Sequence, residues 1–239
     1  MIPKVIHYCW FGRGEMPQLA KDCIASWHKY MPDWEYKLWN EDNFDVDIIP
    51  YTKEAYEAKK YAFVSDYVRL WALEREGGLY MDVDFEVYKS FEDLSGYHAF
   101  AGFEGSKYSP VMMGVIASEP HGFWVSEQLN HYQYRHFIKE NGTLDLTTNV
   151  QFVTSKMREK GLIQNGLEQD YYDLHIFPVD YFCPKQTTGE FFRTENTYCE
   201  HKGLNSWACH EKSWKSMVSK VLGRKGMIKL IKLKRKLFG

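Results

Sequence analysis

Strand and helix patterns alternate along the first forty residues. Residues 5 to 10 form an apolar run typical of a buried strand, and the glycine-containing segment 11 to 14 follows it as a loop. Residues 17 to 30 have helical spacing with Pro17 in the first turn, and residues 34 to 39 alternate between polar and apolar like a second strand. This strand–helix–strand order predicts parallel strands joined by a right-handed crossover.

The clearest helical pattern covers residues 53 to 76, which contain neither Gly nor Pro and end at Gly77 and Gly78. Residues 79 to 87 have the pattern of a strand interrupted by an acidic triplet. The other predicted strands are 99–103, 111–117 and 175–179, and the other predicted helices are 121–140 and 150–160. Together these elements predict an α/β fold with a mixed, mostly parallel sheet flanked by helices.

Charge is distributed unevenly along the 239 residues. The last 28 residues carry +10, and the preceding 211 residues therefore carry −12, which together give the net charge of −2. We accordingly expect one domain over residues 1–211 and a basic tail over 212–239. An acidic body argues against nucleic acid as the main partner. Residues 224–238 place most apolar side chains on one helical face and most Lys on the other, which predicts binding to an anionic membrane surface. A solvated tail is the alternative.

The five cysteines are irregularly spaced, and the chain begins without the apolar segment of a signal peptide. This pattern predicts reduced thiols in the cytoplasm. No stretch approaches the roughly 20 apolar residues of a membrane span. Combined with the basic tail, these features predict a cytoplasmic protein that lies peripherally at the inner face of the cell membrane.

Four charged side chains have spacings that favour one shared site. Asp66 and Arg69 are three residues apart on a predicted helix, so they share a face. Asp82 and Asp84 are two residues apart in a predicted strand, so we expect them to share a face while Val83 points into the sheet. The two glycines at 77 and 78 allow a sharp turn between helix and strand. We therefore expect these groups to converge at a strand end, where α/β sheets bind ligands.

Two neighbouring carboxylates without a cation raise one another's pKa and cost stability. A hard divalent ion such as Mn²⁺ or Mg²⁺ relieves this repulsion, and it usually completes its coordination with substrate phosphates. The metal would then neutralise negative charge that develops on a leaving diphosphate. An Asp-x-Asp triplet alone is also common in ordinary exposed turns, so the residues around it decide the interpretation.

The surrounding residues strengthen the interpretation. The string Ser65-Asp66-x-x-Arg69, then Leu73, then Gly77-Gly78-x-Tyr80-x-Asp82-x-Asp84 resembles the sugar-binding region of glycosyltransferase family 32. That family includes bacterial capsule and surface-polysaccharide transferases and fungal mannosyltransferases, and the region is also similar to the bacterial glucosylating toxins. The opening segment and residues 194–207 resemble the family as well. The resemblance implies a GT-A fold, a nucleotide-sugar donor such as a UDP-sugar, and retention at the anomeric carbon.

The resemblance also implies a role for individual residues. Asp66 and Arg69 would hold the donor sugar, and Asp84 would bind the metal directly. Asp82 would contact the ribose or a water on the metal. The remaining implied contacts are Trp10 stacked on the base, Tyr80 beside the nucleotide, Asn149 at the donor or acceptor, His201 as a metal ligand, and Ser206 and Trp207 in a loop over the diphosphate. Relatives often have a second His where this chain has Lys202, which leaves the later metal ligand open.

Several of these residues also have a purely structural interpretation. Trp10 could be a core residue at a strand end, and Asn149 could cap the helix that follows it. We interpret His7 as structural. Arg13 lies in the first loop, where it could meet a phosphate.

Sugar transfer to a saccharide or lipid-linked saccharide acceptor in surface-polysaccharide synthesis is the leading functional hypothesis. A nucleotidyltransferase also holds a metal between carboxylates, but it normally has a glycine-rich basic loop after its first strand, and Gly12-Arg13-Gly14 is a faint version of one. A non-catalytic sugar-binding module rich in aromatic residues is the third possibility.

Overall fold

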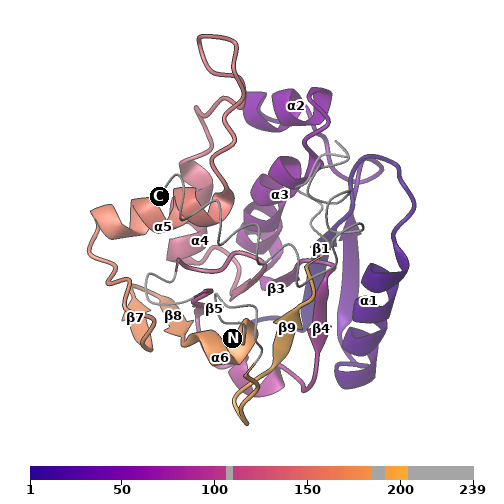
Figure 1. Ribbon diagram of the computed structural model, residues 1–239, viewed down its shortest axis with the longest axis vertical. Helices are drawn as coiled ribbons and strands as arrows, with labels where there is room; N and C mark the ends of the chain where they lie inside the picture. The colour runs from indigo at the N-terminus through magenta and orange to yellow at the C-terminus, as the bar shows by residue number, and fades with distance from the viewer. Residues whose placement is uncertain (106–109, 185–191, 204–239) are drawn as a thin grey trace, which may run out of the picture. The chain divides into compact units, whose positions relative to one another are not determined.

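The computed structural model describes residues 1–105, 110–184 and 192–203 of the chain, which fold into the helices and strands of Figure 1. The helices are α1 (Gln18–Tyr30), α2 (Pro50–Glu57), α3 (Tyr61–Glu76), η1 (Glu92–Leu94), α4 (Phe123–Asn130), α5 (Asn149–Glu159) and α6 (Val179–Phe182). The strands are β1 (Val5–Cys9), β2 (Glu35–Trp39), β3 (Gly78–Met81), β4 (Phe85–Val87), β5 (Ala99–Gly102), β6 (Val115–Ser118), β7 (Gln169–Tyr171), β8 (Leu174–Phe177) and β9 (Cys199–His201).

The described residues form a seven-stranded sheet with the order β2-β1-β3-β6-β5-β8-β7, and a two-stranded sheet of β4 and β9. Strands β1 and β2 pair in parallel across α1, and β1 also pairs in parallel with β3. Strand β6 is antiparallel to both of its neighbours, and β7 is antiparallel to β8. Five of these seven strands therefore run in one direction, which confirms the predicted mixed, mostly parallel sheet and its first crossover.

Each face of the large sheet is covered by its own apolar core. On one face, Tyr80 and Ile116 from the sheet pack with α3, α4 and α5. On the other, Leu79 and Met81 pack with α1, β4 and α6. Because side chains alternate along a strand, the one short strand β3 supplies both cores. The site discussed below lies where β3 ends, between the two covering layers.

Gly77 and Gly78 form the turn from α3 into β3, as the sequence predicts. Their φ angles are 65° and 105°. A Cβ on Gly78 would lie 2.5 Å from Cγ1 of Val5, so only glycine allows β3 to pair this closely with β1. The buried His7 supports the turn, because its Nε2 lies 2.8 Å from the Gly77 carbonyl oxygen and its Nδ1 accepts from the Trp39 indole at 3.1 Å. Burial lowers the pKa of His7, and its predicted structural role is confirmed.

The prediction of one continuous helix over residues 53–76 is wrong, because the structure has two helices there. Helix α2 starts at Pro50 and ends at Glu57, and Lys59 then adopts a φ of 56° before α3 begins at Tyr61. The break brings the Tyr61 ring against Gly12, where a Cβ would meet the ring at 2.3 Å. This long-range contact outweighs local helix propensity, and no Gly or Pro signals it.

The predicted helix 121–140 is also too long, because α4 ends at Asn130. The chain then forms a hairpin-like segment with a bridge between Ile138 and Leu144. Glu54 on α2 accepts backbone hydrogen bonds from Phe137 at 2.7 Å and Ile138 at 2.8 Å, which fixes this extended course. The sequence also missed the short elements β7, α6 and β9.

The four cysteines within the described residues, Cys9, Cys23, Cys183 and Cys199, are buried thiols. None of the described helices is long and apolar enough to cross a membrane. The predicted boundary near residue 211 and the basic tail lie outside the described residues, so that division of the chain stays a prediction.

Candidate active site

The Asp82-Val83-Asp84 triplet is a turn that joins β3 of the large sheet to β4 of the small one. The Phe85 amide donates to the Asp82 carbonyl oxygen at 3.2 Å, and only Val83 of the three enters an apolar core. The triplet is therefore a turn and not the extended strand that the sequence predicts. Burial raises the pKa of Asp82 and the negative charge of Asp84 adds to that rise, so the two carboxylates lie within electrostatic reach of one another. Because the chain changes sheets here, Asp82 interacts with α3 and Asp84 with β9.

Arg69 is the cation that joins the first group of site residues. Its Nη2 donates to Asp66 Oδ1 at 2.9 Å and lies 3.4 Å from Asp82 Oδ1. Its Nη1 donates to the Met113 carbonyl oxygen at 2.6 Å, and its guanidinium lies 4.7 Å from the centre of the Tyr80 ring. The side chains of Arg69 and Asp66 are 3% and 1% exposed. Breaking such a buried pair by removing one partner typically costs about 3–5 kcal/mol of folding free energy.

Asp82 is the partly exposed end of this group, with 30% of its side chain open to solvent. The Tyr80 hydroxyl donates to its Oδ1 at 2.8 Å. Burial raises the pKa of both Asp66 and Asp82, and the positive charge of Arg69 opposes that rise. The predicted convergence of Asp66, Arg69 and Asp82 is present, with Tyr80 as part of the same group.

Asp84 and His201 form the second group of site residues. His201 Nε2 lies 3.0 Å from Asp84 Oδ2, and the imidazole stacks on Phe85 with ring centres 4.9 Å apart. The strand pairing puts His201 opposite Phe85. His201 therefore comes into contact with Asp84, which lies 117 positions earlier in the sequence. Burial lowers the pKa of His201, but the hydrogen bond and charge of Asp84 outweigh burial and raise it.

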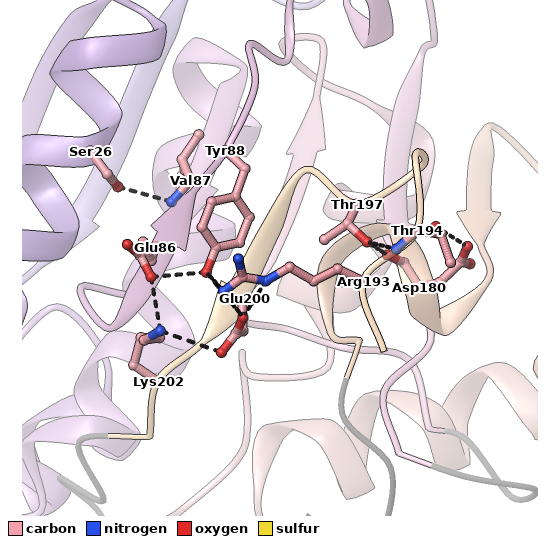
Figure 2. A network of polar contacts seen from close by, with 10 residues as sticks. All are labelled: Ser26, Glu86, Val87, Tyr88, Asp180, Arg193, Thr194, Thr197, Glu200 and Lys202. Atoms are coloured by element: carbon pink, nitrogen blue, oxygen red, sulfur yellow. Dashed lines mark hydrogen bonds and ion pairs between the residues drawn. The ribbon is translucent and has the colours of Figure 1, made fainter. Parts of the chain in front are cut away.

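A polar network on the small sheet holds β9 beside β4 (Figure 2). Glu200, which is 4% exposed, accepts from Arg193 Nη2 at 2.6 Å and from the Tyr88 hydroxyl at 3.0 Å. Lys202 lies 2.8 Å from Glu86 and 3.4 Å from Glu200. The Lys202 amide also donates to the Asp84 carbonyl oxygen at 2.8 Å. These contacts on both sides of His201 fix the strand that carries it. The side chain of Lys202 is engaged in this network.

Glu104 is a carboxylate near the site that the sequence analysis did not single out. It follows β5, whose carboxyl end lies at the same sheet edge as that of β3, and its amide donates to the Pro110 carbonyl oxygen at 3.0 Å. Burial raises the pKa of Glu104 to about 7, with the positive charge of His201 opposing and the negative charge of Asp82 reinforcing this rise. A lone Glu after a strand gave no motif to recognise.

The structure places the other residues that were predicted to contact the ligand in different environments. Trp10 is half-buried at the end of β1, and its indole N–H donates to the Gly14 carbonyl oxygen at 2.6 Å. Arg13 pairs with Asp42 at 2.5 Å and is 59% exposed, so its charge is already balanced. Asn149 is buried inside the first turn of α5, whereas Thr148 is the N-cap with a capping box to Gln151. The alternative role of Asn149 as the cap is therefore wrong.

The donors at the site suit a hard divalent cation only in part. Among the described residues, no group of three or more His, Cys, Asp or Glu side chains is arranged to hold a metal ion. Asp84 and His201 nevertheless offer a carboxylate oxygen and an imidazole nitrogen in contact, and both atom types bind Mn²⁺. Two protein donors are enough where substrate phosphates supply the rest. Ser206 and Trp207, predicted to cover the diphosphate, lie outside the described residues.

The mixed sheet and the Asp-x-Asp turn at the end of β3 define a GT-A-type fold. Residues 17–101 match the family described as the glycosyltransferase sugar-binding region containing a DXD motif. The matched part includes Asp66, Arg69, Asp82 and Asp84. The predicted recognition is thereby confirmed for the sugar-binding region.

Two curated proteins are similar over most of the chain. A mannosyl phosphorylinositol ceramide synthase of Saccharomyces cerevisiae is 25% identical over 74% of this chain and 49% of its own length. A glycosyltransferase of Acanthamoeba polyphaga mimivirus is 23% identical over 89% of this chain and 86% of its own length. The chain thus spans about half the length of the yeast relative. Among solved structures, PaToxG glycosyltransferase is 17% identical with a TM-score of 0.49, covering 67% of this chain and 70% of that chain.

Proposed function

We propose that the chain transfers a sugar from a nucleotide diphosphate sugar to a saccharide or lipid-linked saccharide acceptor in a metal-dependent reaction. One observation carries the proposal: the Asp84–His201 contact and the Asp66–Arg69–Asp82 group arise from the two ends of one short turn. A cation-binding pair therefore adjoins a buried, charged group suited to orienting a polar ligand. The matched sugar-binding region supports the same interpretation.

The residues divide the work as follows. Asp84 and His201 would hold Mn²⁺ or Mg²⁺, which when bound neutralises charge on the leaving diphosphate. Asp82, fixed by Tyr80 and Arg69, would contact the ribose or a water on the metal. Asp66 and Arg69 would orient the donor sugar, so that proximity supplies much of the rate. Trp10 would stack on the base.

The resemblances to known proteins suggest a more specific donor and acceptor. The family resemblance favours a UDP-sugar, retention at the anomeric carbon and a role in surface-polysaccharide synthesis. The printed name of the yeast relative includes a mannosyl group and phosphorylinositol ceramide. A mannosyl donor and an inositol-containing lipid acceptor are therefore candidates beside UDP-glucose and a saccharide.

The decisive experiment measures product release from nucleotide sugars with and without Mn²⁺. We expect release of the nucleoside diphosphate that depends on Mn²⁺, and a loss of at least about 100-fold in Asp84→Asn, because roughly 2.7 kcal/mol of charge stabilisation disappears. Asp22→Asn, an exposed aspartate of α1, is the matched control and should keep full activity.

Three results would contradict the proposal. Release of pyrophosphate would indicate a nucleotidyltransferase. Sugar binding without any turnover would indicate a binding module. Full activity of Asp84→Asn would remove the assigned metal ligand.

We extend the proposal to a membrane-bound acceptor reached through the basic tail. Ten Lys or Arg in the last 28 residues would favour an anionic surface by about 1 kcal/mol for each residue near it. The full chain should sediment with phosphatidylserine liposomes and remain in solution with phosphatidylcholine liposomes. Deleting residues 224–239 should abolish the difference, and unchanged sedimentation after the deletion would contradict membrane binding through the tail.

A further inference from the structure

Glu104 is a carboxylate whose charge the surrounding residues leave without a partner. It is half-buried shortly after the end of β5. Its carboxylate forms no hydrogen bond and no ion pair with any residue that the structure describes. Other buried carboxylates near the site are paired with a cation, Asp66 with Arg69 and Glu200 with Arg193. Because a charge withdrawn from water without a partner costs free energy, Glu104 is a candidate for a functional role.

The alternation of side chains along β5 determines the face to which Glu104 points. Phe100 packs in the core that includes β4 and α6, whereas Phe103 packs in the core that includes α3. Strand pairing continues past β5, because Phe103 forms a bridge with Val111 and the Glu104 amide donates to the Pro110 carbonyl oxygen at 3.0 Å. Successive side chains of an extended chain point to opposite faces. Glu104 therefore points to the face that β4 covers.

Two electrostatic interactions place Glu104 beside both groups of site residues. The positive charge of His201 and the negative charge of Asp82 both act on its carboxylate, although no hydrogen bond or ion pair joins it to either. His201 belongs to the group proposed for the metal and diphosphate, and Asp82 ends the group proposed for the sugar. The bond that breaks in sugar transfer joins the diphosphate to C1 of the sugar. A bond held between the two groups is therefore within reach of Glu104.

A negative charge at this place suits the chemistry of sugar transfer. When the bond from C1 to the diphosphate breaks, its electron pair stays on the phosphate oxygen, and the sugar ring acquires the positive charge of an oxocarbenium-like transition state. The acceptor oxygen then bonds to C1, and its proton passes to the released diphosphate. A poorly solvated carboxylate close to C1 stabilises this positive charge, and it stabilises the neutral ring of the bound donor much less.

We infer that Glu104 is a catalytic residue whose carboxylate contacts the transferring sugar and stabilises the positive charge that develops at C1. This inference rests on the proposed function. It also accounts for the missing partner, because a cation paired with Glu104 would cancel the charge that the reaction uses. The Asp84–His201 pair then serves the leaving group, and Glu104 serves the sugar.

The test compares Glu104→Gln with Glu119→Gln in the full chain. Glu119 follows β6 as Glu104 follows β5, but β6 is antiparallel to β5, so Glu119 lies at the opposite edge of the sheet and pairs with His98. The assay measures hydrolysis of UDP-glucose, UDP-galactose and GDP-mannose in Mn²⁺. Because water is the acceptor, a loss of rate cannot come from weaker binding of an acceptor sugar.

Glu104→Gln should lower kcat for the preferred nucleotide sugar by at least about 100-fold, a typical loss when one group that stabilises transition-state charge is removed. Its affinity for the same nucleotide sugar should change by less than about twofold, because the charge at C1 is absent from the bound donor. Glu104→Asp keeps the charge on a shorter side chain and should recover part of the lost kcat. Glu119→Gln should keep the kcat of the unaltered protein.

Thermal unfolding at pH 8 gives a measurement that does not depend on activity. Glu104→Gln should unfold at a temperature no lower than the unaltered protein, because it removes a charge that lacks a partner. A lower unfolding temperature would assign the carboxylate to the fold and overturn the inference. An unchanged kcat would overturn it too, as would a loss of donor affinity as large as the loss of kcat. If the unaltered protein hydrolyses none of the three nucleotide sugars, the proposed function fails and the inference falls with it.

Discussion

On the β9 side of the candidate site, polar groups are paired through strands and a surface network, whereas on the α3 side the charged groups are paired inside the protein, closed to solvent. Asp84 meets His201 across two hydrogen-bonded strands, and Glu200 and Lys202 reinforce that pairing. On the α3 side, Arg69 donates to Asp66 at 2.9 Å, and the two side chains are only 3% and 1% exposed. The first side is partly open to solvent, and the second is buried.

This difference follows from what each side is proposed to bind. A metal ion can replace water and protons directly at the Asp84–His201 pair, because this pair is partly open to solvent: the side chain of His201 is 40% exposed. A sugar ring brings its own donors and acceptors, and the groups that orient it act best when packing and hydrogen bonds hold them in place, as in the buried pair of Asp66 and Arg69. The two sides should therefore respond differently to substitution.

The largest expected effect is on the α3 side, in Arg69→Met. Removing the cation leaves Asp66 and Asp82 without their shared partner, and we expect a loss of about 3–5 kcal/mol in the free energy of unfolding at pH 7. Without Arg69, the pKa of Asp66 rises further above its unfolded value. Protonation then favours the folded state at low pH, so the loss should be smaller at pH 5 than at pH 8. Urea unfolding at the two pH values measures this.

Arg13→Met is the matched control for that experiment. Arg13 also pairs with an aspartate, but its side chain is 59% exposed, so its removal should hardly shift the urea midpoint at either pH. If the two variants lost the same stability, or if the loss in Arg69→Met were independent of pH, burial of the Asp66–Arg69 pair would not set the α3 side apart.

Much of the fold was predictable because its signals are local. The apolar run before Gly12, the amphipathic helix after it and the glycine pair at 77 and 78 each specify their element through a few neighbouring residues. The errors occur where distant contacts decide. Tyr61 against Gly12 breaks the predicted helix 53–76, and Glu54 draws residues 137 and 138 out of the predicted helix 121–140.

In the candidate site, too, local signals were predictable and long-range contacts were not. Asp66 and Arg69 were predictable as a pair because helical spacing brings them together, and their contact at 2.9 Å confirms it. The conformation of the triplet that contains Asp82 and Asp84 was not predictable, because an extended triplet and a turn between two sheets have the same spacing in sequence. Glu104 was missed, since it comes near Asp82 and His201 only through the arrangement of distant strands.

The β9 side gives the smaller expected effect, in Glu200→Gln. Glutamine keeps the shape of Glu200 but weakens its charged hydrogen bonds to Arg193 and Lys202, so β9 should hold His201 less firmly. We expect about a tenfold weaker affinity for Mn²⁺, the lower range for residues that orient metal ligands, with little change in affinity for the nucleoside diphosphate without metal. Glu168→Gln is the control, because the exposed Glu168 side chain pairs with His175 outside the network, and it should change neither value. Unchanged Mn²⁺ affinity in Glu200→Gln would mean that strand pairing alone positions His201, and the network of Figure 2 would then serve stability rather than the site.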